Sequence, residues 1–236
     1  SMAFDTIMVF HDHFKNHILP EQIHILNVAF LVPDMRREYG GCAGNIAYNL
    51  KLLGGDPVIM ATVGDDFAPY AERLKTLGLE SAYIHRVANT FTAQAFITTD
   101  LADNQITAFH PGAMNFAHQN KVDCNDGIKL GIVSPDGRQG MINGEELLAF
   151  IQQAEYLTCN DYEAKLLQER TGQTLEQLAK QVRALVVTLG GEGSRVYADG
   201  QVHAIAAAKA TAVVDPTGCG DAFRAGLMTG MHKGMD

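Results

Sequence analysis

Strand-like and helical segments alternate along most of this chain, and that order constrains its fold more than any other feature. Such a chain builds a mostly parallel sheet, because each helix carries the chain back to begin the next strand in the same direction. Ligands of these folds bind at the carboxyl ends of the strands. We therefore predict an α/β fold, a three-layer αβα sandwich that residues 1–236 form as a single domain. Helical patterns cover residues 45–53, 66–77, 145–154, 175–183 and the stretch from 221 onward, and strand-like runs cover residues 57–63, 129–133, 156–159 and 184–188.

One part of the chain departs from this alternation. Apolar and polar side chains take turns along residues 91–98, the Asp103-Asn104 pair indicates a tight turn, and residues 105–109 return as a strand. The pattern predicts a hairpin inserted into the α/β core. The early segment, residues 6–38, lacks helical periodicity, and we expect it to pair with the hairpin in a small separate sheet.

Composition and charge exclude several classes of function. Lys and Arg number 18 against 27 Asp and Glu, so the formal net charge is −9 and a nucleic-acid partner is repelled on average. The longest apolar run, near residues 23–32, is too short to cross a bilayer, so no membrane is expected. The four cysteines are widely scattered, which suits a reducing compartment, and we expect a cytoplasmic protein that acts on a small molecule.

The segment with the clearest chemistry is glycine-rich and opens the last helix, at residues 215–221. Glycine lets backbone N–H groups approach a ligand closely, so Gly218, Cys219 and Gly220 predict an anion hole for a phosphoryl group in transfer. Asp221 stands where a carboxylate can accept the proton of an acceptor hydroxyl. A plain helix cap after a glycine turn explains the same spacing equally well. The chain has no Walker A, HRD or DFG sequence, which excludes P-loop and protein-kinase chemistry.

Three further segments place polar or glycine residues beside an expected helix or strand. Gly40 to Asn45 precede a helix, and Asn45 offers a donor and an acceptor to hydroxyl groups, although a capped glycine turn fits as well. Asn160 to Glu163 follow a strand and suit either water-mediated Mg²⁺ binding or a helix cap. Thr188 to Gly193 follow another strand and suit nucleotide phosphates, although they do not match the GxGxxG pattern.

Taken together, these segments resemble the ribokinase-like (PfkB) family of sugar and nucleoside kinases. The two glycine signatures, the Asn160–Glu163 segment and the Thr188 glycine loop occur in the order of that family and span most of the chain. Three details resemble the bacterial adenosine kinases in particular. They are Pro216 with Arg224 in the last signature, Asn104-Gln105 in the hairpin, and His110-Pro111-Gly112-Ala113-Met114.

The resemblance implies a ribokinase-like fold with a small β-sheet lid, formed by about residues 6–38 and 88–110. Closure of the lid would exclude water from the reaction. In relatives this lid also builds dimers, so a homodimer through the lid is implied. The resemblance makes Asp221 the catalytic base and Gly218, Cys219 and Gly220 the anion hole. It makes Asp5, Gly41 and Asn45 sugar contacts and Phe96 the lid aromatic that stacks on the base. Asn160, Thr188, Gly190 and Gly193 become ATP contacts, and Glu163 is tied to Mg²⁺.

The reaction that the resemblance implies is phosphoryl transfer from ATP to the 5′-hydroxyl of adenosine, which gives ADP and AMP, with Mg²⁺ offsetting the phosphate charge. A sugar kinase of the same family, such as a ribokinase or a fructokinase, is the first alternative. A non-catalytic ligand-binding relative is the second. Asp221 and the glycine signatures argue against it, because a protein that only binds a ligand needs no base there.

Three parts of the family's fold have no counterpart in this sequence. No core strand precedes Asp5, only a few residues lie between Asp136 and Glu145, and the chain stops at Asp236 before the helices that complete the adenine pocket. A crossover between parallel strands needs a dozen or more residues. We therefore expect the natural polypeptide to be longer, with breaks before Ser1, between Asp136 and Glu145, and after Asp236.

Overall fold

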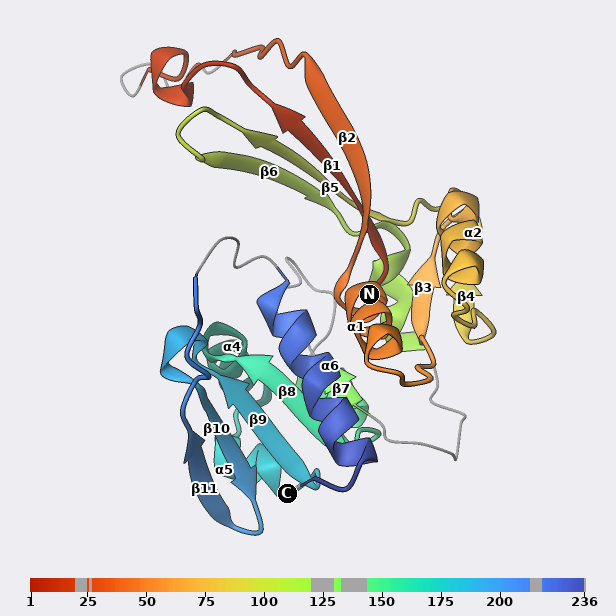
Figure 1. Ribbon diagram of the computed structural model, residues 1–236, viewed down its shortest axis with the longest axis vertical. Coiled ribbons are helices and arrows are strands. Elements are labelled where there is room, and N and C mark those ends of the chain that lie inside the picture. Colours follow the sequence, from red (N-terminus) through yellow and green to blue (C-terminus); the bar gives the residue numbers. More distant parts are fainter. Residues whose placement is uncertain (20–24, 26, 120–129, 133–143, 213–217, 236) are drawn as a thin grey trace. The chain divides into compact units, whose positions relative to one another are not determined.

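The structure is a computed structural model that describes residues 1–19, 25, 27–119, 130–132, 144–212 and 218–235. The chain divides into two compact units (Figure 1). Unit 1 consists of Ser1–Tyr48 and Asp56–Asn120, and unit 2 of Asn49–Gly55 and Lys121–Asp236.

Unit 1 contains a four-stranded sheet in the order β2-β1-β5-β6 (Figure 1). β1 and β5 run parallel at its centre, and β2 and β6 pair antiparallel with them at the edges. β5 and β6 form the expected hairpin, and β1 and β2 come from the early part of the chain. The predicted small sheet, called the lid sheet from here on, is therefore confirmed. Its strands are β1 (Ala3–Val9), β2 (Asp34–Gly40), β5 (Ala93–Thr99) and β6 (Gln105–His110).

Four of the remaining elements of unit 1, namely α1, α2, β3 and β4, share one buried core with the start of β1. This core joins side chains such as Phe4 of β1, Ala47 of α1, Val63 of β3 and Tyr70 of α2. β3 and β4 form a separate two-stranded parallel sheet. The elements of unit 1 outside the lid sheet are η1 (Phe14–Asn16), α1 (Cys42–Leu52), β3 (Ala61–Val63), α2 (Ala68–Thr76), β4 (Ile84–Arg86) and η3 (Gly112–Gln119).

α1 begins at Cys42, earlier than the sequence pattern predicts. The backbone carbonyl of Ser1 accepts hydrogen bonds from the N–H groups of Ala43 (2.9 Å) and Gly44 (3.4 Å). These are first-turn donors that lack partners inside the helix, so the start of β1 takes the place of a side-chain cap. Asn45 therefore lies inside the first turn of α1 rather than at its cap.

Asp66, the expected cap of α2, binds the lid sheet instead. α2 has Phe67 at its N-cap. The Asp66 carboxylate accepts hydrogen bonds from the backbone N–H of Thr92 (2.7 Å) and from the side-chain amide of Gln94 (3.0 Å). Since these residues lie just before and within β5, the contact ties the lid sheet to the start of α2.

Unit 2 is built on a five-stranded sheet in the order β11-β10-β9-β8-β7. β7, β8 and β9 run parallel, as the alternation of strands and helices predicts. β10 lies antiparallel to β9, and β11 antiparallel to β10. The strands are β7 (Leu130–Ile132), β8 (Tyr156–Asn160), β9 (Ala184–Thr188), β10 (Ser194–Ala198) and β11 (Gln201–Ile205).

Helices cover both faces of this sheet (Figure 1). Side chains alternate between the faces along a strand, so Leu157 and Thr158 of β8 point to opposite sides. α3, α4 and α5 share a buried cluster with Leu157, whereas Arg224 of α6 donates a hydrogen bond to Thr158. The αβα layering is therefore confirmed within unit 2. Its helices are α3 (Gly144–Ile151), α4 (Asp161–Thr171), α5 (Leu175–Ala179), η4 (Gly190–Glu192) and α6 (Cys219–His232).

α4 is absent from the helices that the sequence pattern predicts. Most of its side chains are polar, and only Ala164 and Leu167 are buried among them. These two residues are three apart and lie on one face, which is enough to attach the helix to the core of unit 2. The amphipathic signal of α4 is therefore weak, and its start is marked only by the polar segment Asn160–Glu163.

Some expectations fall on residues outside the described ranges. They concern the ends of the strand-like run 129–133, most of the segment between Asp136 and Glu145, and residues 215–217 of the last glycine signature. Among the helices of the described ranges, none has the length and apolar character needed to cross a membrane.

Candidate active site

The start of α6 presents exposed backbone to a ligand. Gly218 is the N-cap residue with a φ of 77°, a left-handed conformation that glycine adopts without steric penalty. Gly218, Cys219 and Gly220 are all exposed, and a Cβ at Gly218 would meet nothing within 4 Å. The first N–H groups of a helix lack intrahelical partners, and the helix dipole favours an anion beside them. The three residues expected to form the anion hole thus lie at an exposed helix start, a position that favours an anion.

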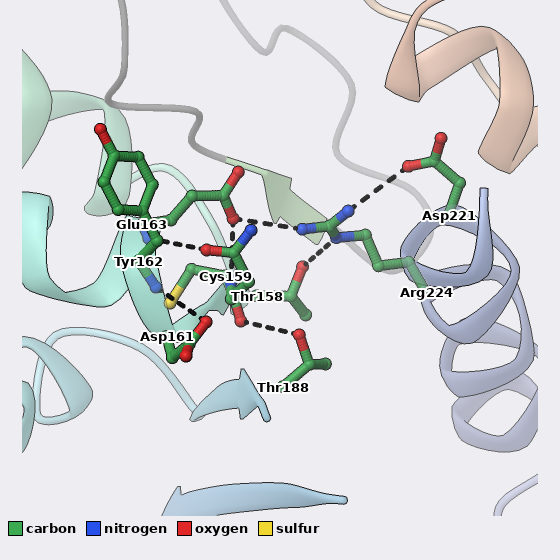
Figure 2. Close-up of polar contacts among 9 residues, drawn as sticks. Thr158, Cys159, Asp161, Tyr162, Glu163, Thr188, Asp221 and Arg224 are labelled. Carbon is green, nitrogen blue, oxygen red and sulfur yellow. Dashed lines mark hydrogen bonds and ion pairs between the residues drawn. The ribbon is translucent and has the colours of Figure 1, made fainter. Parts of the chain in front are cut away.

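Asp221, in the first turn of α6, is buried beside Arg224 (Figure 2). Nη1 of Arg224 lies 3.4 Å from Oδ1 of Asp221, and Nη2 lies 3.5 Å from Oε2 of Glu163. Nε of Arg224 donates a hydrogen bond of 3.1 Å to Oγ1 of Thr158. The three charged side chains are only 10% to 14% exposed, and a buried charge is costly in free energy unless an opposite charge lies beside it. One guanidinium therefore serves two carboxylates that come from different helices.

Asn160 and Glu163 form a capping box at the start of α4. The backbone N–H of Glu163 donates to Oδ1 of Asn160 (2.7 Å), and the backbone N–H of Asn160 donates to Oε2 of Glu163 (2.8 Å). The helix-cap explanation of this segment is therefore correct. It does not exclude a second role, because the same Oε2 also lies beside Arg224.

Cys159, next to this capping box, is a packing residue. Burial, together with the negative charge of Glu163, raises the pKa of the Cys159 thiol to about 12. A nucleophilic cysteine needs a lowered pKa so that the thiolate forms at neutral pH. The thiol of Cys159 therefore stays protonated and takes no part in covalent chemistry.

The Mg²⁺ that the resemblance implies fits this site with few protein ligands and with water in most of its coordination shell. The described part of the chain contains no group of three or more His, Cys, Asp or Glu that could hold a metal ion. Mg²⁺ usually keeps several waters and is held by one or two carboxylates together with substrate phosphates. Glu163 and Asp221, which lie on either side of Arg224, suit that mode of binding.

Thr188, Gly190 and Gly193 lie at the end of β9 and in the loop that follows. Thr188 pairs in register with Asn160, so both residues lie at the carboxyl edge of the parallel strands, where ligands bind in α/β folds. Gly193 has a φ of 98°, and a Cβ there would overlap the carbonyl oxygen of Ile205. A Cβ at Gly190 would meet nothing within 4 Å, so the backbone of this loop is open to a ligand.

The expected sugar contacts lie in unit 1. Asp5 of β1 is in register with Glu38 of β2, and a Cβ at Gly40 would overlap the carboxylate of Asp5. Glycine at position 40 therefore makes room for that carboxylate. Gly41 precedes α1 with a φ of 89°, a conformation that favours glycine, and Asn45 lies in the first turn of the same helix.

Phe96 lies on the opposite face of the lid sheet from Asp5. Asp5 is in register with Ala95 of β5, and Ala95 with Phe109 of β6, so these three side chains share one face, the Asp5 face. Phe96 follows Ala95 and therefore points to the other side, as Thr6 does. The structure does not bring Phe96 together with Asp5. An aromatic ring on the Asp5 face is that of Phe109, which is 48% exposed.

Burial, together with the negative charge of Glu38, raises the pKa of Asp5. Between the ordinary value of 3.8 and this raised pKa, the folded protein binds more protons than the unfolded chain, so Asp5 lowers stability as the pH rises through that window. We expect Asp5→Asn to match the wild type in unfolding free energy at low pH and to exceed it at pH 7. Urea unfolding across that pH range measures the difference. Glu38→Gln removes one of the two causes of the raised pKa, so in that background the gain in stability from Asp5→Asn should be smaller. An Asp5→Asn protein less stable than the wild type at pH 7 would contradict the raised pKa of Asp5.

Arg224 and Phe109 are absent from the site residues that the sequence predicts. Arg224 stands one helical turn after Asp221, and residues three apart share a helix face, so the spacing itself points to their contact. Phe109 lies near the end of the returning strand of the hairpin, but the face it occupies depends on the register of β6 with β5.

Comparison with known proteins gives three findings. The sequence matches the pfkB family carbohydrate kinase over residues 4–134 and 117–236. The nucleoside kinase of Methanocaldococcus jannaschii is 31% identical over 234 residues, covering 89% of this chain and 78% of that protein, and a fructokinase of Escherichia coli is 28% identical over 239 residues, covering 82% and 77%. Among solved structures, the Burkholderia thailandensis nucleoside kinase in complex with ADP-inosine is 46% identical, with a TM-score of 0.71, covering 98% of this chain and 81% of that one.

Proposed function

Because the chain belongs to the pfkB family of carbohydrate kinases, we propose that it transfers a phosphoryl group from ATP to the 5′-hydroxyl of a nucleoside, with adenosine as the first candidate. As a member of this family, it is a phosphotransferase that acts on a hydroxyl group. The observation that carries the proposal is the carboxylate of Asp221. It is held in the first turn of α6, directly after the exposed glycine-rich backbone of residues 218–220.

In this proposal, Asp221 accepts the proton of the acceptor hydroxyl, and the backbone N–H groups of residues 218–220 stabilise charge on the transferred group. When bound, ATP supplies the phosphoryl group, and Mg²⁺ offsets the charge of its phosphates. Thr188, Gly190 and Gly193 would contact those phosphates, and Glu163 would reach the metal through water. The transition state of phosphoryl transfer is loose, so positioning and electrostatics contribute more than the strength of the base.

A nucleoside acceptor is supported by the relatives and by the Asp5 face. Two of the relatives are named nucleoside kinases, and the Burkholderia thailandensis one is described in complex with ADP-inosine. On the Asp5 face, the Asp5 carboxylate suits sugar hydroxyls, Phe109 suits the base, and Ala95 between them carries only a methyl group. Stacking of a base on an aromatic ring contributes about 1–3 kcal/mol. We therefore assign base stacking to Phe109 in place of Phe96.

The opposite face of the lid sheet suits a second copy of the chain, in line with the implied homodimer. Register places Phe96, Met35 and Ile106 on this face, and each of the three is more than 40% exposed. Exposed apolar side chains that gather on one sheet face are typical of protein–protein contacts. This gives Phe96 a role that does not involve the substrate.

A sugar kinase is the second candidate, because the fructokinase of Escherichia coli is among the relatives. An ADP-release assay with adenosine, inosine, ribose and fructose in parallel separates the two candidates. We expect kcat/KM for the nucleosides to exceed that for ribose roughly 5–150-fold, since only a nucleoside gains the stacking energy of about 1–3 kcal/mol. Equal values for ribose and adenosine would contradict the nucleoside proposal. An absence of turnover with all four would contradict the assignment of Asp221 as a working base.

A further inference from the structure

Arg224 lies between the two carboxylates that the proposed reaction uses (Figure 2). Its partners belong to three elements: Asp221 to α6, Glu163 to α4 and Thr158 to β8. Thr158 is fully buried, so it provides a fixed point for Nε. The two outer nitrogens then point to one carboxylate each, 3.4 and 3.5 Å away.

The charges of this cluster nearly balance only while Arg224 is present. One guanidinium and two carboxylates sum to a net charge of −1, and without Arg224 the sum is −2. All three side chains are 10% to 14% exposed, so water screens them weakly. The phosphates of a nucleotide are anionic, so the uncompensated pair would repel them.

The geometry of the guanidinium adds a positional effect to this charge. Its donors lie in one rigid plane, so fixing Nε on Thr158 also fixes the directions of both outer nitrogens. Both distances to the carboxylates exceed the 2.7–2.9 Å that is usual for a charged pair, so Arg224 is shared between them. A lysine has a single nitrogen and cannot reach three partners from that position.

We propose that Arg224 is a positioning residue that holds Asp221 and Glu163 in place relative to each other. Through one side chain, the base that activates the acceptor is coupled to the carboxylate beside the nucleotide phosphates. This inference rests on the kinase function proposed above.

Four variants test the proposal: Arg224→Met, Arg224→Lys, Glu163→Gln and the double variant Arg224→Met/Glu163→Gln. Arg183→Met is the matched control, because Arg183 forms an exposed ion pair with Glu155 at 3.2 Å. Two measurements are made on each folded variant. They are kcat and KM with adenosine, and ADP binding by calorimetry without Mg²⁺. Thermal denaturation checks folding, and if Arg224→Met does not fold, the lysine and double variants carry the test.

We expect Arg224→Met to lower kcat about 10²-fold with little change in KM for adenosine, because a small displacement of reacting groups has that effect. It should also weaken metal-free ADP binding several-fold. Arg224→Lys, which keeps the charge, should bind ADP like the wild type but turn over more slowly. The double variant, whose net charge returns to −1, should recover ADP binding. Its kcat should still lie below that of Glu163→Gln alone, because Asp221 has lost its anchor.

Two results would overturn the proposal. One is a folded Arg224→Met protein with the kcat of the wild type. The other is equal kcat in the double variant and in Glu163→Gln, since Arg224 would then not position Asp221. A purely structural role would lower the melting temperature without separating ADP binding from kcat. If the wild type phosphorylates no acceptor, the proposed kinase function is wrong. The ADP-binding measurement on the same variants then still tests whether Arg224 offsets the charges of Asp221 and Glu163.

Discussion

Replacing Asp221 with asparagine is expected to lower kcat by about 10²–10⁴-fold, the usual contribution of a positioned general base. Asparagine has the same size and keeps an oxygen that can accept the hydrogen bond from Arg224, but it cannot take a proton at neutral pH. The first turn of α6 should therefore form as before, and KM for the nucleoside should change little. Steady-state kinetics with saturating ATP and adenosine measures the loss, and circular dichroism verifies the fold.

Asp161→Asn is the matched control for this variant. Asp161 is also an acidic residue in the first turn of a helix, but it is exposed, and its Oδ1 accepts a hydrogen bond from the N–H of Tyr162 (3.0 Å). The control should keep nearly full activity. If a folded Asp221→Asn protein turned over adenosine as fast as this control does, another group must accept the proton.

Phe109→Ala is expected to raise KM for adenosine roughly 5–150-fold, which corresponds to the loss of about 1–3 kcal/mol of stacking. KM for ribose should not change, because ribose has no base to stack. Phe96→Ala is the matched control: the two rings are 41% and 48% exposed, so the variants remove similar surface from opposite faces of the lid sheet. Its KM for adenosine should stay near that of the wild type. A larger effect at Phe96 than at Phe109 would contradict the assignment of faces.

The same assignment can be followed by fluorescence, because the chain contains no tryptophan. Phe109→Trp introduces a single reporter that can still stack on a base. Its emission should change when adenosine is added without ATP, and the emission of a Phe96→Trp protein should not. The opposite pattern would place the base on the other face of the lid sheet.

Features that depend on neighbouring residues could be predicted from the sequence. The hairpin turn is one example: Asp103 adopts a φ of 58°, as the Asp103-Asn104 signal indicates. The start of α6 is another, since Gly218 takes a left-handed conformation and Asp221 follows in the first turn. The capping box of Asn160 and Glu163 was also visible as spacing. In each case, the relevant contacts lie within a few residues of one another.

Features that depend on distant segments of the chain could not be predicted from the sequence. Alternation along one strand separates its two faces but does not tell which one carries Asp5. That depends on the register of β1 with β5, which pairs residues 3–9 with residues 93–99. The start of α1 depends likewise on the carbonyl of Ser1, and the partnership of Arg224 with Glu163 depends on how α6 lies against α4 and β8. Packing decides these contacts, and no local pattern records them.

The strand order of the lid sheet has a consequence for the synthesis of the protein. β1 leaves the ribosome before the other three strands of this sheet, yet it lies at the centre of the sheet, between β2 and β5. Roughly 50 residues separate the end of β2 from the start of β5, and at about 5–20 residues per second their synthesis takes about 3–10 s. During that time the edge of β1 that will pair with β5 has no partner strand, and a free edge invites pairing with other chains. The order that places Asp5 in the middle of the sheet thus leaves each nascent chain open to aggregation until Thr99 has been added.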